Sequence, residues 1–128
     1  MQRAVELFAV IQFTLMGLSH IVNHRAWVEF FIRLRSLGYA GVFMNGFLSL
    51  GTGAFIVALH PVWSGLPLVL TVFGVLNLAK AAQCFLLPEL AMRSLQRVAP
   101  ERSREFVVAG SVMLVIAAVV TMGMVRGA

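Results

Sequence analysis

Two histidines, His20 and His24, are the first residues in this sequence whose types and spacing could support chemistry. They lie in the segment GLSHIVNHRAWVEFF, where a long apolar run gives way to charged residues. A helix can present two metal ligands at this i, i+4 spacing, and a haem would use one histidine as an axial ligand. The alternative, which we favour, is that His20, Asn23 and His24 hydrogen-bond to the C-terminus of a helix and to lipid headgroups.

The third histidine is not expected to join them. His60 follows the second apolar segment, which places it about 30 Å away, on the other side of a bilayer core. Glu29 or a residue of a second subunit would have to complete a metal site. No CxxC motif, phosphate-binding glycine loop or nucleophile elbow is present.

Lys80 is a second candidate, because it lies about eight residues before the end of an apolar span, roughly 12 Å inside by helix rise. An ionisable residue within a membrane span is a candidate functional site by default. A polar cluster from three helices is expected near its depth. Its members are Gln12, Asn45, Ser49, Asn77 and Lys80, with Gln83 nearer the surface.

Two interpretations of this cluster remain open. The favoured one is that the polar side chains join the helices while Lys80 extends toward the interface. The other is a site for a small ligand or a partner subunit. No acidic residue is expected at this depth, since Glu6 lies at the opposite end of the spans. The Lys80 charge must then be met by amides, water, an anionic ligand, a quinone-type carbonyl, a lipid headgroup or a partner.

The elements that position these residues follow from composition. Of the 128 residues, 60% are hydrophobic and 12% are charged, whereas soluble domains have about 25% charged residues. Residues 36–79 contain no Asp, Glu, Lys or Arg, which is more than the roughly 20 residues that one crossing needs. The turn-forming segment HPVWSGLP divides this run. We therefore expect a single all-α domain over 1–128, a bundle of four transmembrane helices at about 4–22, 38–59, 66–87 and 106–125.

The arginines predict the orientation of these spans. They gather in the segments between spans one and two and between spans three and four, while the middle loop has none. The positive-inside rule makes both basic segments cytoplasmic and both termini external. Each segment also has the pattern of a short amphipathic helix lying on the membrane surface. Residues expected at the interface are Trp27, Phe30, Phe31, Arg33, Arg35, Trp63, Arg93 and Arg97. Nucleic acid is not an expected partner, because the basic residues have this simpler explanation.

The stretch GLSHIVNHRAWVEFFIRLRSLGYAG resembles the DoxX-like small membrane proteins. These are four-helix proteins whose glycine-containing first helix runs into an amphipathic stretch and then a glycine-led second helix. The resemblance covers the layout of the whole chain, but only this stretch in residues. Many members have a lysine near the end of the first helix, where this sequence has His20 or His24, so no catalytic residue is carried over. The resemblance implies an accessory role beside a quinone-linked oxidoreductase.

From these observations we expect a small integral membrane protein without catalysis of its own, acting as an accessory or interaction subunit. Its expected partners are membrane lipids and other membrane subunits or a second copy, and no cofactor is expected. The alternative is a quinone- or haem-linked oxidoreductase subunit or a small transporter that uses the polar cluster around Lys80. Lys80 is the only lysine among ten basic residues, which is typical of a GC-rich bacterial genome and favours a bacterial cytoplasmic membrane.

Overall fold

The computed structural model describes residues 2–127, and helices form most of it. The helices are α1 (Gln2–Val22), α2 (His24–Ser36), α3 (Tyr39–Leu59), α4 (Leu68–Leu86), α5 (Pro88–Gln96), the 3-10 turn η1 (Pro100–Arg102) and α6 (Arg104–Val125). Four of them, α1, α3, α4 and α6, are long and apolar enough to cross a bilayer. The all-α prediction is therefore confirmed for the described residues, and the four apolar helices lie within a few residues of the four predicted spans.

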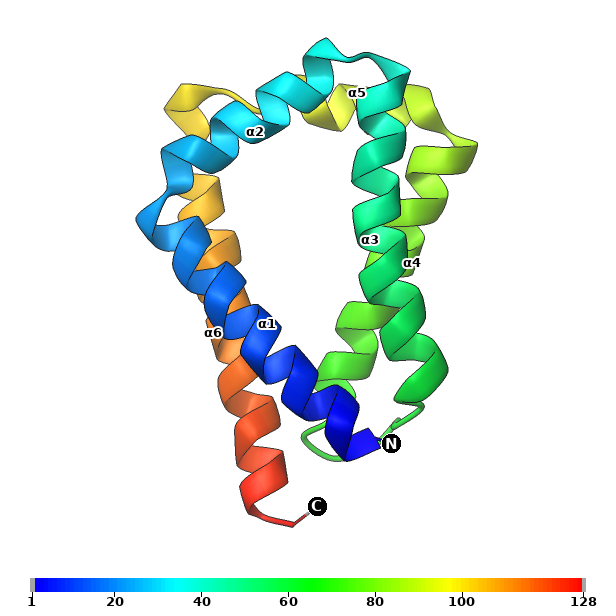
Figure 1. Ribbon diagram of the computed structural model, residues 1–128, viewed down its shortest axis with the longest axis vertical. Coiled ribbons are helices and arrows are strands. Elements are labelled where there is room, and N and C mark those ends of the chain that lie inside the picture. The colour runs from blue at the N-terminus through cyan, green and yellow to red at the C-terminus, as the bar shows by residue number, and fades with distance from the viewer. Residues whose placement is uncertain (1, 128) are drawn as a thin grey trace.

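The four spans are arranged as two pairs. Helix α1 packs closely against α6, and α3 packs closely against α4, whereas contacts between the two pairs are few. Figure 1 shows the pairs diverging from the end that holds both termini toward the end crossed by α2 and α5. We call these the terminal end and the connector end. The four predicted spans are therefore arranged as two closely packed pairs with few contacts between them.

Glycines bring the helices of each pair together. A Cβ atom added at Gly110 of α6 would lie 2.5 Å from the carbonyl oxygen of Gly17 in α1. In the other pair, a Cβ atom at Gly53 would lie 2.7 Å from the backbone nitrogen of Leu78. Lipid tails are as apolar as the helix side chains, so the hydrophobic effect does not drive helices together within a bilayer. Helices there associate through close packing at small residues such as these glycines.

This packing predicts that Gly110→Ala separates α1 from α6 and lowers the free energy of unfolding by about 1–3 kcal/mol, the usual cost of overpacking. Gly51→Ala is the matched control, because a Cβ atom there would meet nothing within 4 Å and alanine favours the helix. Thermal unfolding of both variants in detergent measures the difference. Equal stability of the two variants would contradict the close approach at Gly110.

The buried core joins all four spans only near the terminal end. One cluster combines Val5 and Ala9 of α1, Ile56 of α3, Leu70 of α4 and Val120 of α6 with their neighbours. The second cluster, at the connector end, contains residues of α3, α4 and α5. The space between the two clusters is where the helix pairs have separated.

Helices α2 and α5 close the connector end. Val28 and Leu34 of α2 and Leu95 of α5 are buried. The Arg35 guanidinium donates hydrogen bonds to the carbonyl oxygens of Gln96, at 3.4 Å, and Val98, at 3.1 Å. Two short helices were predicted here. The apolar faces of α2 and α5 pack on the spans and on each other. The two helices therefore cover this end of the bundle.

Candidate ligand-binding cavity

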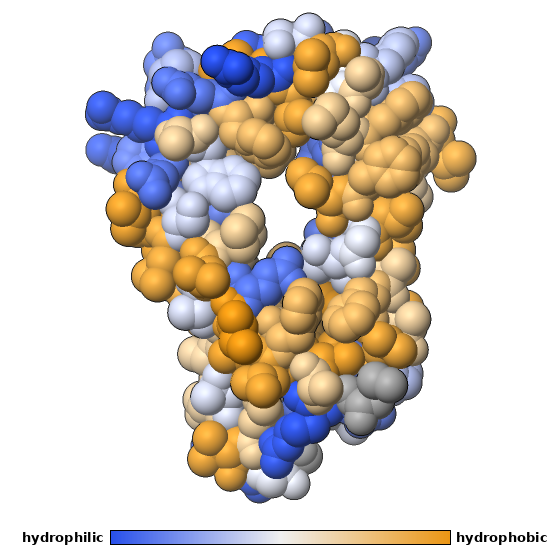
Figure 2. Space-filling view, in the orientation of Figure 1, coloured by the Kyte–Doolittle hydropathy of each residue, from blue (hydrophilic) through white to orange (hydrophobic). Residues whose placement is uncertain are grey.

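A cavity of about 380 Å³ lies between the two helix pairs. Figure 2 shows it as an opening through the middle of the molecule, with hydrophilic side chains at part of its rim. Its walls come from α1, α2, α3, α4 and α6. The cavity exists because the two pairs diverge toward α2 and make few contacts with each other.

The polar wall contains most of the residues that the sequence predicted as a cluster. Gln12 comes from α1, Asn45 and Ser49 from α3, and Asn77 and Lys80 from α4, and all five line the cavity. Asn45 and Ser49 are buried. Gln83 does not line this cavity but an adjoining one of about 190 Å³, which Asn45 and Lys80 also line. The structure thus brings the predicted residues together, while their binding of a ligand stays a prediction.

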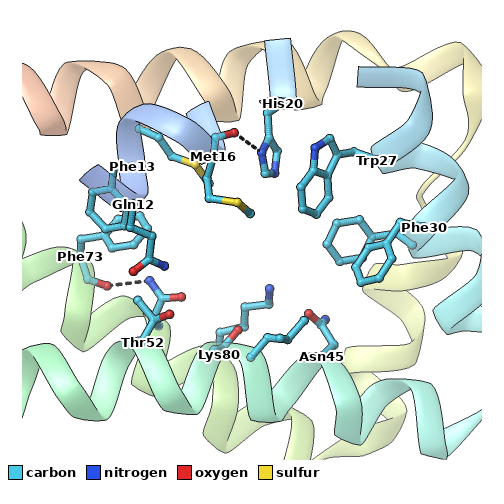
Figure 3. A pocket seen from close by; sticks show the side chains of 15 residues that line it. Gln12, Phe13, Met16, His20, Trp27, Phe30, Asn45, Thr52, Phe73 and Lys80 are labelled. Carbon is cyan, nitrogen blue, oxygen red and sulfur yellow. Dashed lines mark hydrogen bonds between the residues drawn. The ribbon is translucent and has the colours of Figure 1, made fainter. Parts of the chain in front are cut away.

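Lys80 is the charged residue of this wall. Its side chain extends into the cavity (Figure 3) and keeps a large exposed surface there. Among residues 2–127 no hydrogen bond or ion pair involves its ammonium group, and the ion pair that is present joins His60 and Glu6. An ammonium group within a membrane span without a carboxylate is costly, by about 2.5–3.5 kcal/mol at a helix centre. The cavity therefore presents an uncompensated cation.

The opposite wall is aromatic and includes His20. Figure 3 shows His20 across the cavity from Lys80, beside Trp27. The His20 Nδ1 atom donates to the carbonyl oxygen of Met16 at 2.7 Å, and its ring stacks on Trp27 with centroids 4.1 Å apart. Trp27 is held in turn by a hydrogen bond from Nε1 to the Ser19 hydroxyl at 2.9 Å. Because Nδ1 carries the proton of the neutral ring, Nε2 presents its lone pair.

The two histidines of the sequence motif do not form one site. Helix α1 ends at Val22 and α2 begins at His24, so the break at Asn23 places them on different helices. Only His20 lines the cavity, and the His24 Nδ1 atom is buried without a hydrogen-bond partner in the described part of the chain. Within residues 2–127 no group of three or more His, Cys, Asp or Glu residues is placed to hold a metal ion. The i, i+4 spacing therefore does not act within one continuous helix, and metal or haem binding by His20 or His24 stays a prediction.

The residues predicted at the membrane interface divide into two groups. Trp27, Phe30 and Phe31 line the cavity, so their aromatic face meets the interior of the protein. Phe30 is also 38% exposed, and contact of these residues with the membrane interface stays a prediction. Arg33, Arg93 and Arg97 are exposed at the connector end, and Trp63 is 64% exposed in the loop between α3 and α4. Arg35 is half-buried and bonded to backbone carbonyls.

Sequence reasoning missed a buried polar network at the terminal end. The His60 Nε2 atom lies 2.9 Å from Glu6 Oε1, and Nδ1 lies 3.0 Å from the Thr71 hydroxyl. His60 and Thr71 are almost wholly buried and Glu6 is 5% exposed. The topology did carry a signal, since Glu6 and His60 were both expected at this end. His60 was considered only as a ligand for the distant histidines.

The hydrogen bonds of this network determine where its protons lie. The Thr71 hydroxyl donates to the carbonyl oxygen of His60 at 3.0 Å, so it accepts the proton on His60 Nδ1. The contact between His60 Nε2 and Glu6 Oε1 then pairs an imidazole nitrogen with a carboxyl oxygen. The network joins α1 to the α3–α4 pair through buried hydrogen bonds.

Comparisons with known proteins were made against family models, curated proteins and solved structures, and no match to this chain was found in any of them.

Proposed function

We propose that this protein binds a small lipid-soluble molecule in the cavity between its helix pairs. Lys80 would donate hydrogen bonds to an oxygen atom of that molecule. The observation that carries the proposal is the Lys80 ammonium group, which extends into the cavity and has no partner among residues 2–127. Pockets between the helices of a bundle are common binding sites, with apolar walls and a few polar groups that orient the ligand.

The route into the cavity supports a ligand that arrives through the bilayer. Contacts of α1 with α3 and of α4 with α6 are few, so the sides of the cavity lie at the seams between the pairs. The connector end is covered by α2 and α5, and the terminal end is filled by the shared core. A molecule dissolved in lipid therefore has a shorter path than one dissolved in water.

We further propose that binding serves an accessory role in a larger membrane assembly, as the layout shared with DoxX-like proteins implies. The seams between the pairs leave room for a helix of another subunit or of a second copy. The alternative is a subunit of a quinone- or haem-linked oxidoreductase, or a small transporter. A quinone-type carbonyl would accept from Lys80, whereas a haem would use the free Nε2 atom of His20.

Purification in a gentle detergent, followed by mass spectrometry and an absorption spectrum, tests this proposal. We expect a small organic molecule to accompany the wild-type protein in fixed ratio. A Soret band that disappears in His20→Ala would instead favour the haem alternative. Recovery of the protein free of any small molecule, with the same thermal stability before and after delipidation, would contradict ligand binding.

The proposal includes an orientation. We place the connector end in the cytoplasm of a bacterial cell and both termini outside, because the arginines gather at the connector end. Reporter fusions at Ser64 and at Arg126 should then both indicate the outer side of the cytoplasmic membrane. An inner-side signal from the Arg126 fusion would contradict this orientation.

A further inference from the structure

An apolar groove runs between α4 and α6 on the outside of the molecule. It has a volume of about 560 Å³ and is lined by Val72, Phe73, Leu76, Val108, Val112 and their neighbours. Ser111 also lines it, but the Ser111 hydroxyl donates to the carbonyl oxygen of Val107 at 2.8 Å. The groove therefore offers hydrocarbon contacts and no free hydrogen-bond donor.

The groove adjoins the cavity. Phe73 lines both hollows, and the contacts between α4 and α6 beside it are few. A molecule with a polar head in the cavity could therefore place an extended hydrocarbon chain in the groove. The cavity carries the polar groups and the groove is almost wholly apolar, which matches the polar head and the hydrocarbon tail of an amphiphile.

The charge of the cavity selects the head. Lys80 is its one ammonium group, and no Asp or Glu among residues 2–127 lines the wall. A neutral carbonyl would accept a hydrogen bond but would leave the positive charge uncompensated in the membrane. A carboxylate accepts the hydrogen bond and also neutralises the charge of the ammonium group. Charge-assisted hydrogen bonds are shorter and stronger than neutral ones. The amide groups of Gln12 and Asn45 lie on the same wall as further donors.

We propose that the ligand is a single-chain amphiphile with a carboxylate head, of the fatty-acid type. Its head pairs with Lys80 in the cavity, and its chain lies in the groove between α4 and α6. This inference rests on the proposed function, since it names the class of molecule that the cavity takes.

A series of probes that share one chain length tests the head. The sequence has two tryptophans, Trp27 and Trp63. The variant Trp63→Phe therefore keeps Trp27, which lines the cavity, as the single tryptophan of this protein. In nanodiscs of zwitterionic lipid at about pH 8, where a carboxyl group is ionised, we expect saturable quenching of Trp27 by 2-bromododecanoate. The corresponding bromo-alcohol should bind about tenfold more weakly or worse. Lys80→Met should remove the preference for the carboxylate, and Arg33→Met, at an exposed site outside the cavity, should retain it.

Two further variants test the chain. Val112→Phe fills part of the groove and should weaken binding of 2-bromododecanoate by about tenfold. Leu15→Phe is the control, because Leu15 is 66% exposed on α1 and lines neither hollow. Equal effects of these two variants would overturn the placement of the chain.

The outcomes separate this inference from the proposed function. Equal binding of the carboxylate and the alcohol, both weakened by Lys80→Met, would overturn the carboxylate class while the cavity remains a binding site. Tighter binding of dodecyl phosphate than of dodecanoate in competition would overturn it in favour of a phosphate head. Saturable quenching that is unchanged by Lys80→Met, or no saturable quenching by any probe, would overturn the pairing with Lys80.

Discussion

Glu6→Leu and His60→Leu are each expected to lower the free energy of unfolding by about 3–5 kcal/mol, because each removes the hydrogen bond between them and leaves a buried polar atom of the other residue unpaired. Glu6 and His60 lie 2.9 Å apart, and both are buried at the terminal end of the spans. The loss is large since neither side chain has water to replace the missing hydrogen bond. Unfolding of each variant in mixed detergent and denaturant micelles measures it.

The double variant Glu6→Leu/His60→Leu distinguishes a specific pair from two independent sites. We expect it to be about as stable as either single variant, or more stable, because an apolar pair of similar volume often replaces a buried ion pair at little cost. The Thr71 hydroxyl retains its acceptor, which is a backbone carbonyl oxygen. Additive losses in the double variant would contradict the coupling of Glu6 with His60.

Lys80→Met is expected to abolish recovery of the bound molecule while leaving thermal stability equal or slightly higher. The ligand loses charge-assisted hydrogen bonds worth about 1.5–3 kcal/mol, which corresponds to roughly tenfold to more than a hundredfold in affinity. The free protein loses the cost of holding an ammonium group within the membrane. Gentle extraction of each variant, with the bound molecule measured by mass spectrometry, gives the comparison.

Three further variants test whether the charge of Lys80 causes the loss of the bound molecule. Lys80→Arg should keep part of the binding, because the charge and the donors remain. Asn45→Ala should weaken it by a smaller factor, since Asn45 lines the same wall. Arg33→Met, at the exposed connector end, should have no effect. Unchanged recovery with equal or higher stability for Lys80→Met would reduce the cluster to packing between helices.

The positions of the spans and of the polar cluster could be predicted from the sequence for one physical reason. Apolar length and the position of a charge along a helix are local properties, so the run over 36–79 and its break predict where α3 begins and ends and where α4 begins. The depth of Lys80, Asn45 and Asn77 follows from helix rise alone. Residues at one depth on different spans have a fair chance of meeting, and here they line one cavity.

The features that were missed depend on which helices are neighbours. Nothing local indicates that α1 pairs with α6 and α3 with α4, so the divergence of the pairs and the cavity between them were not predicted. The helix break at Asn23 carries no proline or glycine, so nothing local in the sequence indicates that His20 and His24 lie on separate helices. The Glu6–His60 pair required contact across the two helix pairs, which the spacing of residues along the chain does not encode.

The most direct test of the central claim is an experimental structure of the protein in a lipid nanodisc, determined without added ligand. We expect non-protein density in the cavity within hydrogen-bond distance, about 3 Å, of Lys80 Nζ. An elongated density that continues past Phe73 would identify a chain as well as a head. A closed cavity, or one in which Lys80 extends toward the connector end and no density contacts its ammonium group, would contradict the claim that this cavity binds a ligand.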